Sequence, residues 1–256
     1  WRGVLLGPQL MKRSEAKNIN GWLIALYAGF GGLSLALLAY NLALWSALRH
    51  RFQLYYCVMV GSLAAYTFTA SGAVLLALPW MDNNDRLRLN YVILVIAGVA
   101  SLRYMIDYFG RQTFTDRLRR AVDLCSIILF VDAVAFALLA PWGGWFLDSI
   151  YFWSGAALLS LIFPILIEAW QSQARHFWFF VAAWISPLVA SFVRIAHGVG
   201  LLDYNFWWDN SNLIALAIES LLSTALIVAR LRDLSVERDQ ARAGERSALR
   251  LANSDP

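Results

Sequence analysis

The sequence contains little charge and almost no lysine. Only 15% of its 256 residues are charged, whereas a soluble domain carries about 25%, and 60% are hydrophobic. The mean hydropathy is +0.56. This composition excludes an ordinary soluble globular protein and indicates a membrane protein. Lys12 and Lys17 are the two lysines, and no lysine follows them. Because a retinal Schiff base needs a lysine amine, the chemistry of microbial rhodopsins is excluded.

Motifs for catalysis and cofactor binding are also missing. The chain has no HExxH, no GxSxG and no glycine-rich phosphate loop. Cys57 and Cys125 lie in apolar runs without metal-ligand spacing, which is typical of small buried side chains. The net charge of +4 is explained by arginines in short loops and is not a nucleic-acid footprint. We therefore expect no cofactor, no nucleic-acid partner and no enzymatic activity in this segment.

Long apolar runs predict seven membrane-spanning helices. A span needs roughly 20 apolar residues at about 1.5 Å rise each. The predicted spans are 21–47, 53–78, 88–109, 121–141, 149–170, 177–201 and 208–230. Short connections between them force sequential helices to run antiparallel. The expected fold is an all-α bundle of seven transmembrane helices.

The distribution of basic residues predicts the orientation of this bundle. Short cytoplasmic loops are enriched in Lys and Arg. One side holds nine arginines, namely Arg49, Arg51, Arg111, Arg117, Arg119, Arg120, Arg175, Arg230 and Arg232. The opposite side holds six basic residues, namely Arg2, Lys12, Arg13, Lys17, Arg86 and Arg88. We expect an extracytoplasmic N-terminus and a cytoplasmic C-terminus in a bacterial inner membrane.

Several stretches in order resemble one family. The segment 27–72, "YAGFGGLSLALLAYNLALWSALRHRFQLYYCVMVGSLAAYTFTASG", has a glycine-rich start, "AYNL" at 39–42, "LYY" at 54–56 and "SG" at 71–72. The segment 101–120, "SLRYMIDYFGRQTFTDRLRR", leads into a basic loop. Together they resemble bacterial seven-transmembrane receptors with diverse intracellular signalling modules. The resemblance implies a receptor domain over 19–230, preceded at 1–18 by the end of an extracytoplasmic sensory domain or its linker.

The C-terminal stretch 231–256 has a resemblance of its own. The final "ANSDP" (252–256) is similar to the run that opens GGDEF diguanylate cyclase domains. This implies a diguanylate cyclase output after the cytoplasmic signalling helix, and hence cyclic di-GMP signalling. Leu234, Ala241 and Ala248 recur every seven residues, which is a thin coiled-coil seam. We interpret the stretch as a marginally stable dimer linker, so that the seventh helix and the linker would pair in a homodimer. The alternative is a solvated helix without function.

Ionisable residues at membrane depth are candidate functional residues. Arg194 and Glu219 lie on consecutive antiparallel helices, where they can form a buried salt bridge that fixes packing. They can instead form the polar floor of an outward-open pocket for an unknown small ligand. The residues expected to cover that pocket are His197, Tyr204, Trp207 and Trp208.

Four other polar residues are candidates for structural or switch contacts. Arg103 and Asp107 are four residues apart and can pair on one helix face near the inner interface. A switch contact of this pair with Asn41 is the alternative. Asp132 falls near the middle of the fourth span.

These observations favour a receptor and transducer that relays a signal across the lipid bilayer. A small-molecule transporter is the alternative, although no internal repeat is visible. A passive membrane anchor or dimerisation module is a second alternative.

Overall fold

A computed structural model describes residues 13–70, 78–139, 144–198 and 206–252, together with Val74 and Trp142. Within these ranges some side chains, such as those of 13–20 and 206–210, are not described. The described chain is helical. Its seven α-helices are α1 (Arg13–Leu48), α2 (Arg51–Ala70), α4 (Asn83–Phe109), α5 (Asp116–Leu139), α6 (Gly144–Gln171), α7 (Phe177–Gly198) and α8 (Phe206–Ala252). A short 3-10 helix, η1 (Arg111–Thr113), follows α4. The predicted all-helical bundle is confirmed.

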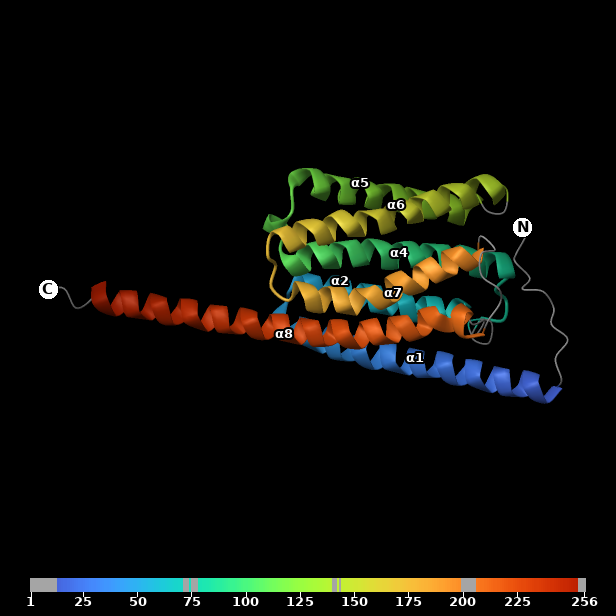
Figure 1. The fold of residues 1–256 in the computed structure, drawn as a ribbon, viewed down its shortest axis with the longest axis horizontal. Helices are drawn as coiled ribbons and strands as arrows, with labels where there is room; N and C mark the ends of the chain where they lie inside the picture. Colours follow the sequence, from blue (N-terminus) through green and yellow to red (C-terminus); the bar gives the residue numbers. More distant parts are fainter. Residues whose placement is uncertain are drawn as a thin grey trace.

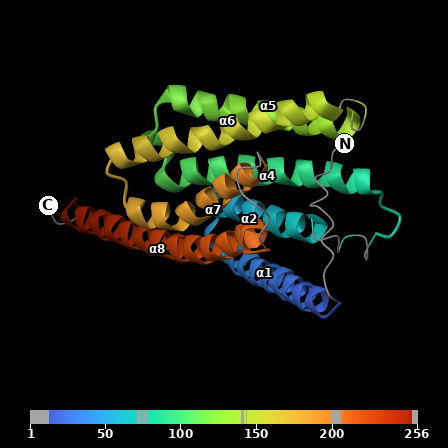
Figure 2. The ribbon, with the colours of Figure 1, turned by 45° about the vertical axis from the view of Figure 1, so that its right-hand side comes forward.

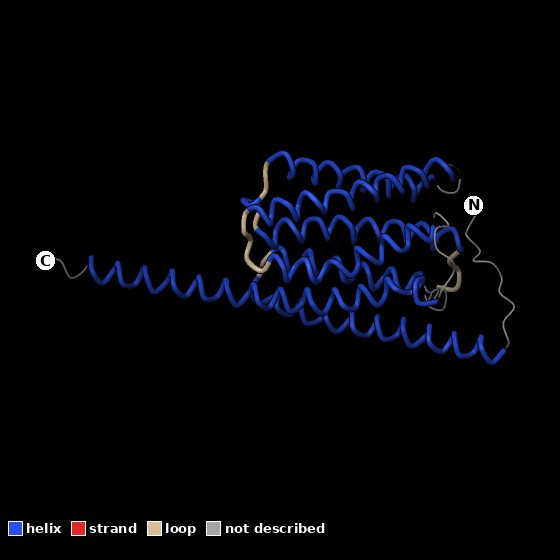
Figure 3. The backbone as a smooth tube through the Cα atoms, in the orientation of Figure 1, coloured by secondary structure: helices blue, strands red, loops and turns tan. Residues whose placement is uncertain are grey.

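The helices form an antiparallel bundle in which neighbours along the chain pack together (Figure 1). In the contacts between helices, α4 has a central place, because it packs on α2, α5 and α6. On the other side, α8 packs on α7 and α1. The turns 49–50, 110–115 and 172–176 all lie at the end of the bundle from which α8 extends (Figure 3). We call this end the exit end.

Turns at the exit end are closed by residues with positive φ. Arg49, Gly110, Gln173 and His176 have φ between 54° and 94°. A residue in this left-handed region commonly terminates a helix, because its backbone turns the chain out of the helical path. Arg49 ends α1, Gly110 ends α4, and the other two bracket the turn between α6 and α7. These tight turns hold the basic residues of the exit end close to the bundle.

Among the residues that the structure describes, five helical segments are long and apolar enough to cross a membrane. They are Gly21–Leu48, Asn83–Phe109, Asp116–Leu139, Ser149–Gln171 and Leu213–Gly244. The apolar part of α7, Phe177–Val193, is shorter. Within the predicted span 53–78 the structure describes α2 up to Ala70, and this helix carries Gln53, Thr67 and Thr69. These polar side chains are buried within the protein, which explains how a less apolar helix fits among membrane helices.

Apolar side chains cover the outside of the bundle. On α5, Leu124, Ile127, Phe130, Val131 and Leu138 are each 59–74% exposed. A water-soluble protein rarely exposes a contiguous apolar surface of this kind. The outer face of α5 is therefore a lipid-facing surface.

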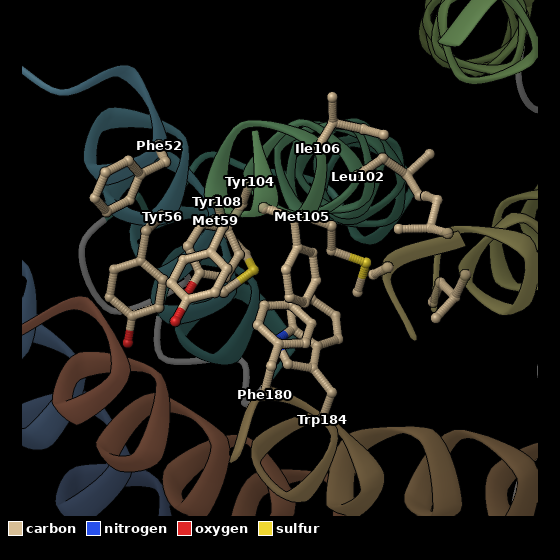
Figure 4. Close-up of a cluster of buried hydrophobic side chains, with 14 of the residues drawn as sticks. Phe52, Tyr56, Met59, Leu102, Tyr104, Met105, Ile106, Tyr108, Phe180 and Trp184 are labelled. Atoms are coloured by element: carbon tan, nitrogen blue, oxygen red, sulfur yellow. The ribbon is translucent and has the colours of Figure 1, made fainter. Parts of the chain in front are cut away.

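An aromatic cluster joins α2, α4 and α7 (Figure 4). The Tyr104 ring of α4 lies 5.4 Å from the Tyr56 ring of α2 and 5.9 Å from the Phe180 ring of α7, measured between ring centroids. Phe180 stacks in turn on Trp184, with centroids 5.7 Å apart and planes at 9°. Such pairs add about 0.5–1.5 kcal/mol each beyond the area they bury. The cluster fixes three helices against which α8 can be positioned.

The last helix continues beyond the bundle as one element. α8 runs for 47 residues from Phe206 to Ala252. Beyond its contacts with the turn between α6 and α7, the helix extends past the exit end (Figures 1 and 2). The helix that the sequence predicts after the seventh span is present up to Ala252. A movement of α8 inside the bundle would therefore be carried directly to its projecting part.

Candidate functional site: contacts that position the exit helix

The inward face of α8 carries a group of polar side chains. Glu219, Ser220 and Ser223 are each at most 1% exposed, and Thr224 is partly buried. Their spacing along the helix places them on one face, because residues three and four apart are neighbours on a helix surface. Polar groups buried at membrane depth are costly unless they are hydrogen-bonded. Their partners therefore define how α8 is held.

Thr224 connects three helices. Its hydroxyl oxygen lies 3.1 Å from the Tyr56 hydroxyl of α2 and accepts a hydrogen bond of 3.3 Å from the Asn41 side-chain amide of α1. Tyr56 also donates to the Ser220 carbonyl oxygen at 2.7 Å, and Asn41 donates to the Leu37 carbonyl oxygen at 2.9 Å. A shift of α8 by one residue moves Thr224 by about 1.5 Å along the axis and by about 100° around it. The network therefore specifies the register of α8.

Glu219 lies one helical turn before Ser223 and is 1% exposed. Ser223 donates a hydrogen bond of 2.6 Å to its Oε1, and Ser220 donates a weaker one of 3.4 Å to its Oε2. Both serines belong to α8, so these two bonds leave the carboxyl group facing the bundle without tying it to another helix. The hypothesis that Arg194 pairs with Glu219 stays a prediction, because the Arg194 side chain lies outside the described residues.

The rest of the predicted outer pocket also lies outside the described part of the structure. Tyr204 is not described, and His197 in α7 and Trp207 and Trp208 in the first turn of α8 have no described side chains. Their assignment to a ligand pocket stays a prediction.

An ionic clamp holds α8 where it leaves the bundle. Asp233 Oδ2 lies 2.7 Å from His176 Nε2 and 3.3 Å from Arg175 Nε. Glu237, one turn further on, lies 3.9 Å from Arg175 Nη1. Within the candidate segment Leu213–Gly244 the apolar run ends at Ala229 and is followed by Arg230 and Arg232, so Asp233 lies beyond the apolar part that spans the membrane. The hydrogen bond from His176 lowers the pKa of Asp233, with Arg175 adding to the effect. Asp233 is therefore ionised at neutral pH, attracts the Arg175 guanidinium and accepts the hydrogen bond from His176.

Sequence reasoning missed this clamp. Arg175 and His176 lie in the turn between α6 and α7, more than fifty residues before Asp233. The visible signal is an acidic pair at 233 and 237, four residues apart and hence on one helix face. Nothing in the sequence shows which turn faces that pair.

The predicted pairing of Arg103 with Asp107 is wrong. Arg103 Nη1 lies 2.6 Å from Asp123 Oδ1 on α5, and Asp107 Oδ1 accepts a 2.8 Å hydrogen bond from Arg111 Nε. The reason is geometric, because helical side chains lean toward the helix N-terminus. Arg111 leans back onto Asp107, whereas Arg103 leans away from it. Arg103 therefore joins α4 to α5.

The predicted switch contact of Asn41 with Arg103 or Asp107 is not observed. The described contacts of Asn41 are with Leu37 and Thr224, as given above. Asn41 thus contacts the exit helix and not α4.

Asp132 is buried in α5, with 4% of its surface exposed. Its Oδ2 has no hydrogen-bond partner among the described residues. Its predicted structural or switch role remains untested by these contacts.

Near the exit end, Glu168 of α6 holds the turn that precedes α5. It accepts 2.8 Å hydrogen bonds from both the backbone N–H and the hydroxyl of Thr115. The turns 110–115 and 172–176 are thus tied to α6 and α8, respectively. In the ranges that the structure describes, no three His, Cys, Asp or Glu side chains form a group that could hold a metal ion.

Comparison with known families gives one match. The family described as 7TM diverse intracellular signalling matches residues 24–230, from α1 to the point where α8 leaves the apolar region. No curated protein matches the chain, and no solved structure matches it. The matched region contains Asn41, Tyr56 and Thr224, whereas Asp233 and Glu237 follow directly after it.

Proposed function

The chain belongs to the family of 7TM diverse intracellular signalling domains, and we propose that it receives a signal in or outside the membrane and relays it through α8 to a cytoplasmic output domain. As a member of this family, the chain is a multi-pass membrane protein that takes part in signalling. The observation that carries the proposal is the continuity of α8, which is buried among polar contacts at Thr224 and projects from the bundle as one helix up to Ala252.

The proposed orientation places the exit end in the cytoplasm. The three turns at this end contain or flank the arginines of the basic side identified in the sequence, and the positive-inside rule favours their retention in the cytoplasm. The N-terminus is then extracytoplasmic, and the projecting part of α8 points into the cytoplasm of a bacterial cell.

The proposed mechanism is a change in the register or tilt of α8. Inside the bundle, Thr224 has two side-chain partners on other helices, and outside it Asp233 is held by the turn between α6 and α7. A signal that rearranges α1, α2 or α7 alters these contacts and repositions the projecting helix. A ligand held by Arg194, His197, Glu219, Tyr204, Trp207 and Trp208 would act near the opposite end of α8.

The proposed output is a diguanylate cyclase, which rests on the similarity of "ANSDP" to the start of GGDEF domains. Such enzymes join two GTP molecules across a dimer, as the resemblance implies. Pairing of two α8 helices along Leu234 and Ala241 would set the distance between two output domains. The segment itself would transmit the signal and carry out no catalysis.

The experiment is to shorten the linker in the complete gene product, expressed in a bacterium depleted of its own cyclic di-GMP. One, two, three, four and seven residues are deleted between 238 and 250, and cyclic di-GMP is measured by mass spectrometry at equal protein levels. Since each residue turns a helix by about 100°, deletions of four and seven leave the phase within about 40° of the original. A deletion of three leaves it about 60° away, and deletions of one and two leave it about 100° and 160° away. We expect the cyclic di-GMP level to vary with the number of deleted residues in step with the helical phase.

Two outcomes would contradict the proposal at different points. If the complete protein produces no cyclic di-GMP, or if the cyclic di-GMP level does not depend on its catalytic domain, the assigned output is wrong. If cyclic di-GMP is produced but all deletions give equal levels, α8 is a passive anchor and the relay is wrong.

A further inference from the structure

A cleft lined by arginines lies at the exit end between α4 and the beginning of α5. Its volume is about 360 Å³, and its charged lining residues are Arg103, Arg111, Arg119, Arg120, Asp116 and Asp123. Four guanidinium groups and two carboxylates give a net charge of +2. Counting Asp107, which pairs with Arg111, the charge remains at +1. The cleft is therefore suited to an anion.

The arginines of the cleft have unused capacity to donate hydrogen bonds. Arg103, Arg111 and Arg119 each contact one aspartate, and each contact joins a single guanidinium nitrogen to a single carboxylate oxygen. Arg120 donates from Nε to the Asp116 carbonyl oxygen at 3.3 Å and forms no ion pair with a carboxylate in the described ranges. A guanidinium has five N–H donors in a planar fork that fits phosphate oxygens. Arg120 is the cation left over for an added anion.

The cleft continues directly into the lipid-facing surface of α5. Asp116, Arg119, Arg120 and Asp123 are followed at helical spacing by Ile127, Phe130, Val131, Val134 and Leu138. The last five side chains are each 42–74% exposed. On α4, Ile96 is 43% exposed two turns from Arg103. A positively charged cleft at one end of an apolar strip matches the shape and polarity of a phospholipid, with its headgroup among the arginines and its acyl chains along α5.

We propose that this cleft binds the headgroup of an anionic phospholipid, such as phosphatidylglycerol, whose acyl chains lie along the exposed face of α5. The charge selects an anion, and the adjoining apolar strip selects a lipid over a soluble phosphate. The bound lipid would bridge Arg103 of α4 and Arg120 of α5 through its phosphate, and so strengthen the packing of these two helices. The inference does not depend on the output domain or on the direction of the signal.

The test uses the full chain purified in detergent and native mass spectrometry to count bound lipids. Phosphatidylglycerol and phosphatidylcholine of equal chain length are titrated separately. We expect the first phosphatidylglycerol to bind at least tenfold more tightly than phosphatidylcholine. Because a basic residue near an anionic lipid contributes about a fivefold change in affinity, Arg120→Gln should weaken binding about fivefold. The double variant with Arg119→Gln should weaken it about 25-fold.

A matched control lies in the same helical turn. Arg117 is exposed but does not line the cleft, so Arg117→Gln should leave the first binding step unchanged. Circular dichroism shows whether each variant is folded. If the double variant does not fold, the single Arg120→Gln change, which removes no ion pair, decides. Equal losses for Arg117→Gln and Arg120→Gln would show nonspecific attraction and overturn the proposal.

Competition separates the lipid from a free phosphate. Inorganic phosphate and glycerophosphoglycerol, which lacks acyl chains, are added at millimolar concentration to the complex. We expect phosphatidylglycerol to remain bound, because the apolar contacts along α5 are absent from both competitors. Full displacement by either compound would show a site for soluble phosphate and would contradict the assignment of a lipid. Equal affinity for phosphatidylcholine would contradict the role of the arginines.

Discussion

Replacing Thr224 by valine tests whether a single hydroxyl connects α8 to two other helices. Valine keeps the branched shape of threonine but removes the oxygen that contacts Asn41 and Tyr56. Neither partner is left without a bond, because Asn41 still donates to the Leu37 carbonyl and Tyr56 to the Ser220 carbonyl. Interhelical hydrogen bonds in membrane proteins contribute about 0.6 kcal/mol each. Loss of two such bonds should lower the free energy of unfolding by about 1 kcal/mol.

The assay is equilibrium unfolding in mixed micelles with increasing sodium dodecyl sulfate, followed by tryptophan fluorescence and circular dichroism. A double-mutant cycle with Tyr56→Phe isolates the contact between Thr224 and Tyr56. We expect the double variant to lose about 0.6 kcal/mol less than the sum of the single losses. The matched control is Thr67→Val, because the Thr67 hydroxyl donates to the Leu63 carbonyl of its own helix.

The control should leave the contacts of α8 unchanged and show no coupling to Tyr56→Phe. If Thr224→Val is no more destabilising than Thr67→Val, or if the cycle is additive, the hydroxyl does not connect the helices. The proposed register of α8 would then lack its physical basis.

The remaining predictions concern three charged positions. Asp233→Asn should change the signalling output of the complete protein more than Glu237→Gln does, because Asp233 lies 2.7 Å from His176 whereas Glu237 lies 3.9 Å from Arg175. Equal effects of the two changes in a cyclic di-GMP assay would argue against the clamp. Glu219→Gln should lower the free energy of unfolding by about 3 kcal/mol if Arg194 is its partner, since an arginine without a counter-ion is then left in the membrane. A loss below about 1 kcal/mol, measured in the same micelles, would rule out the pair. Asp123→Asn should destabilise the bundle by up to about 1 kcal/mol, because it removes the salt bridge to Arg103 of α4. The loss should exceed that of Asp116→Asn, because the partner of Asp116, Arg119, lies on the same helix. The opposite order in the unfolding assay would show that the salt bridge does not hold α4 to α5.

Much of the fold follows from patterns that the sequence displays locally. The apolar run at 88–109 and the boundary at Gly110 predict α4 well, because a membrane helix must satisfy its own backbone hydrogen bonds. The helical continuation of the seventh span through 231–252 also follows, since no proline or long polar turn interrupts it.

The partners of individual charges could not be predicted in the same way. Arg103 has an acidic residue four positions later in the sequence, yet its partner is Asp123 on the next helix. The direction in which helical side chains lean would have favoured Arg111 as the partner of Asp107. No such local rule exists for Asp233 and His176, because their contact depends on which turn lies beside α8 at the exit end. Spacing therefore predicts which residues share a helix face, and the packing of the bundle decides which faces meet.

The most direct measurement of the central claim is the distance between the bundle and the projecting part of α8. Spin labels replace the exposed residues Arg117 and Arg242, and pulsed electron resonance gives the distribution of distances between them. Arg242 lies about 27 Å along the helix axis from Thr224, so a tilt of about 10° at Thr224 moves the label by about 5 Å. The account predicts that Asp233→Asn and Thr224→Val each shift or broaden the distribution by several ångström, while Thr67→Val leaves it unchanged. Identical distributions in all four proteins would contradict the claim that contacts within the bundle set the position of the exit helix.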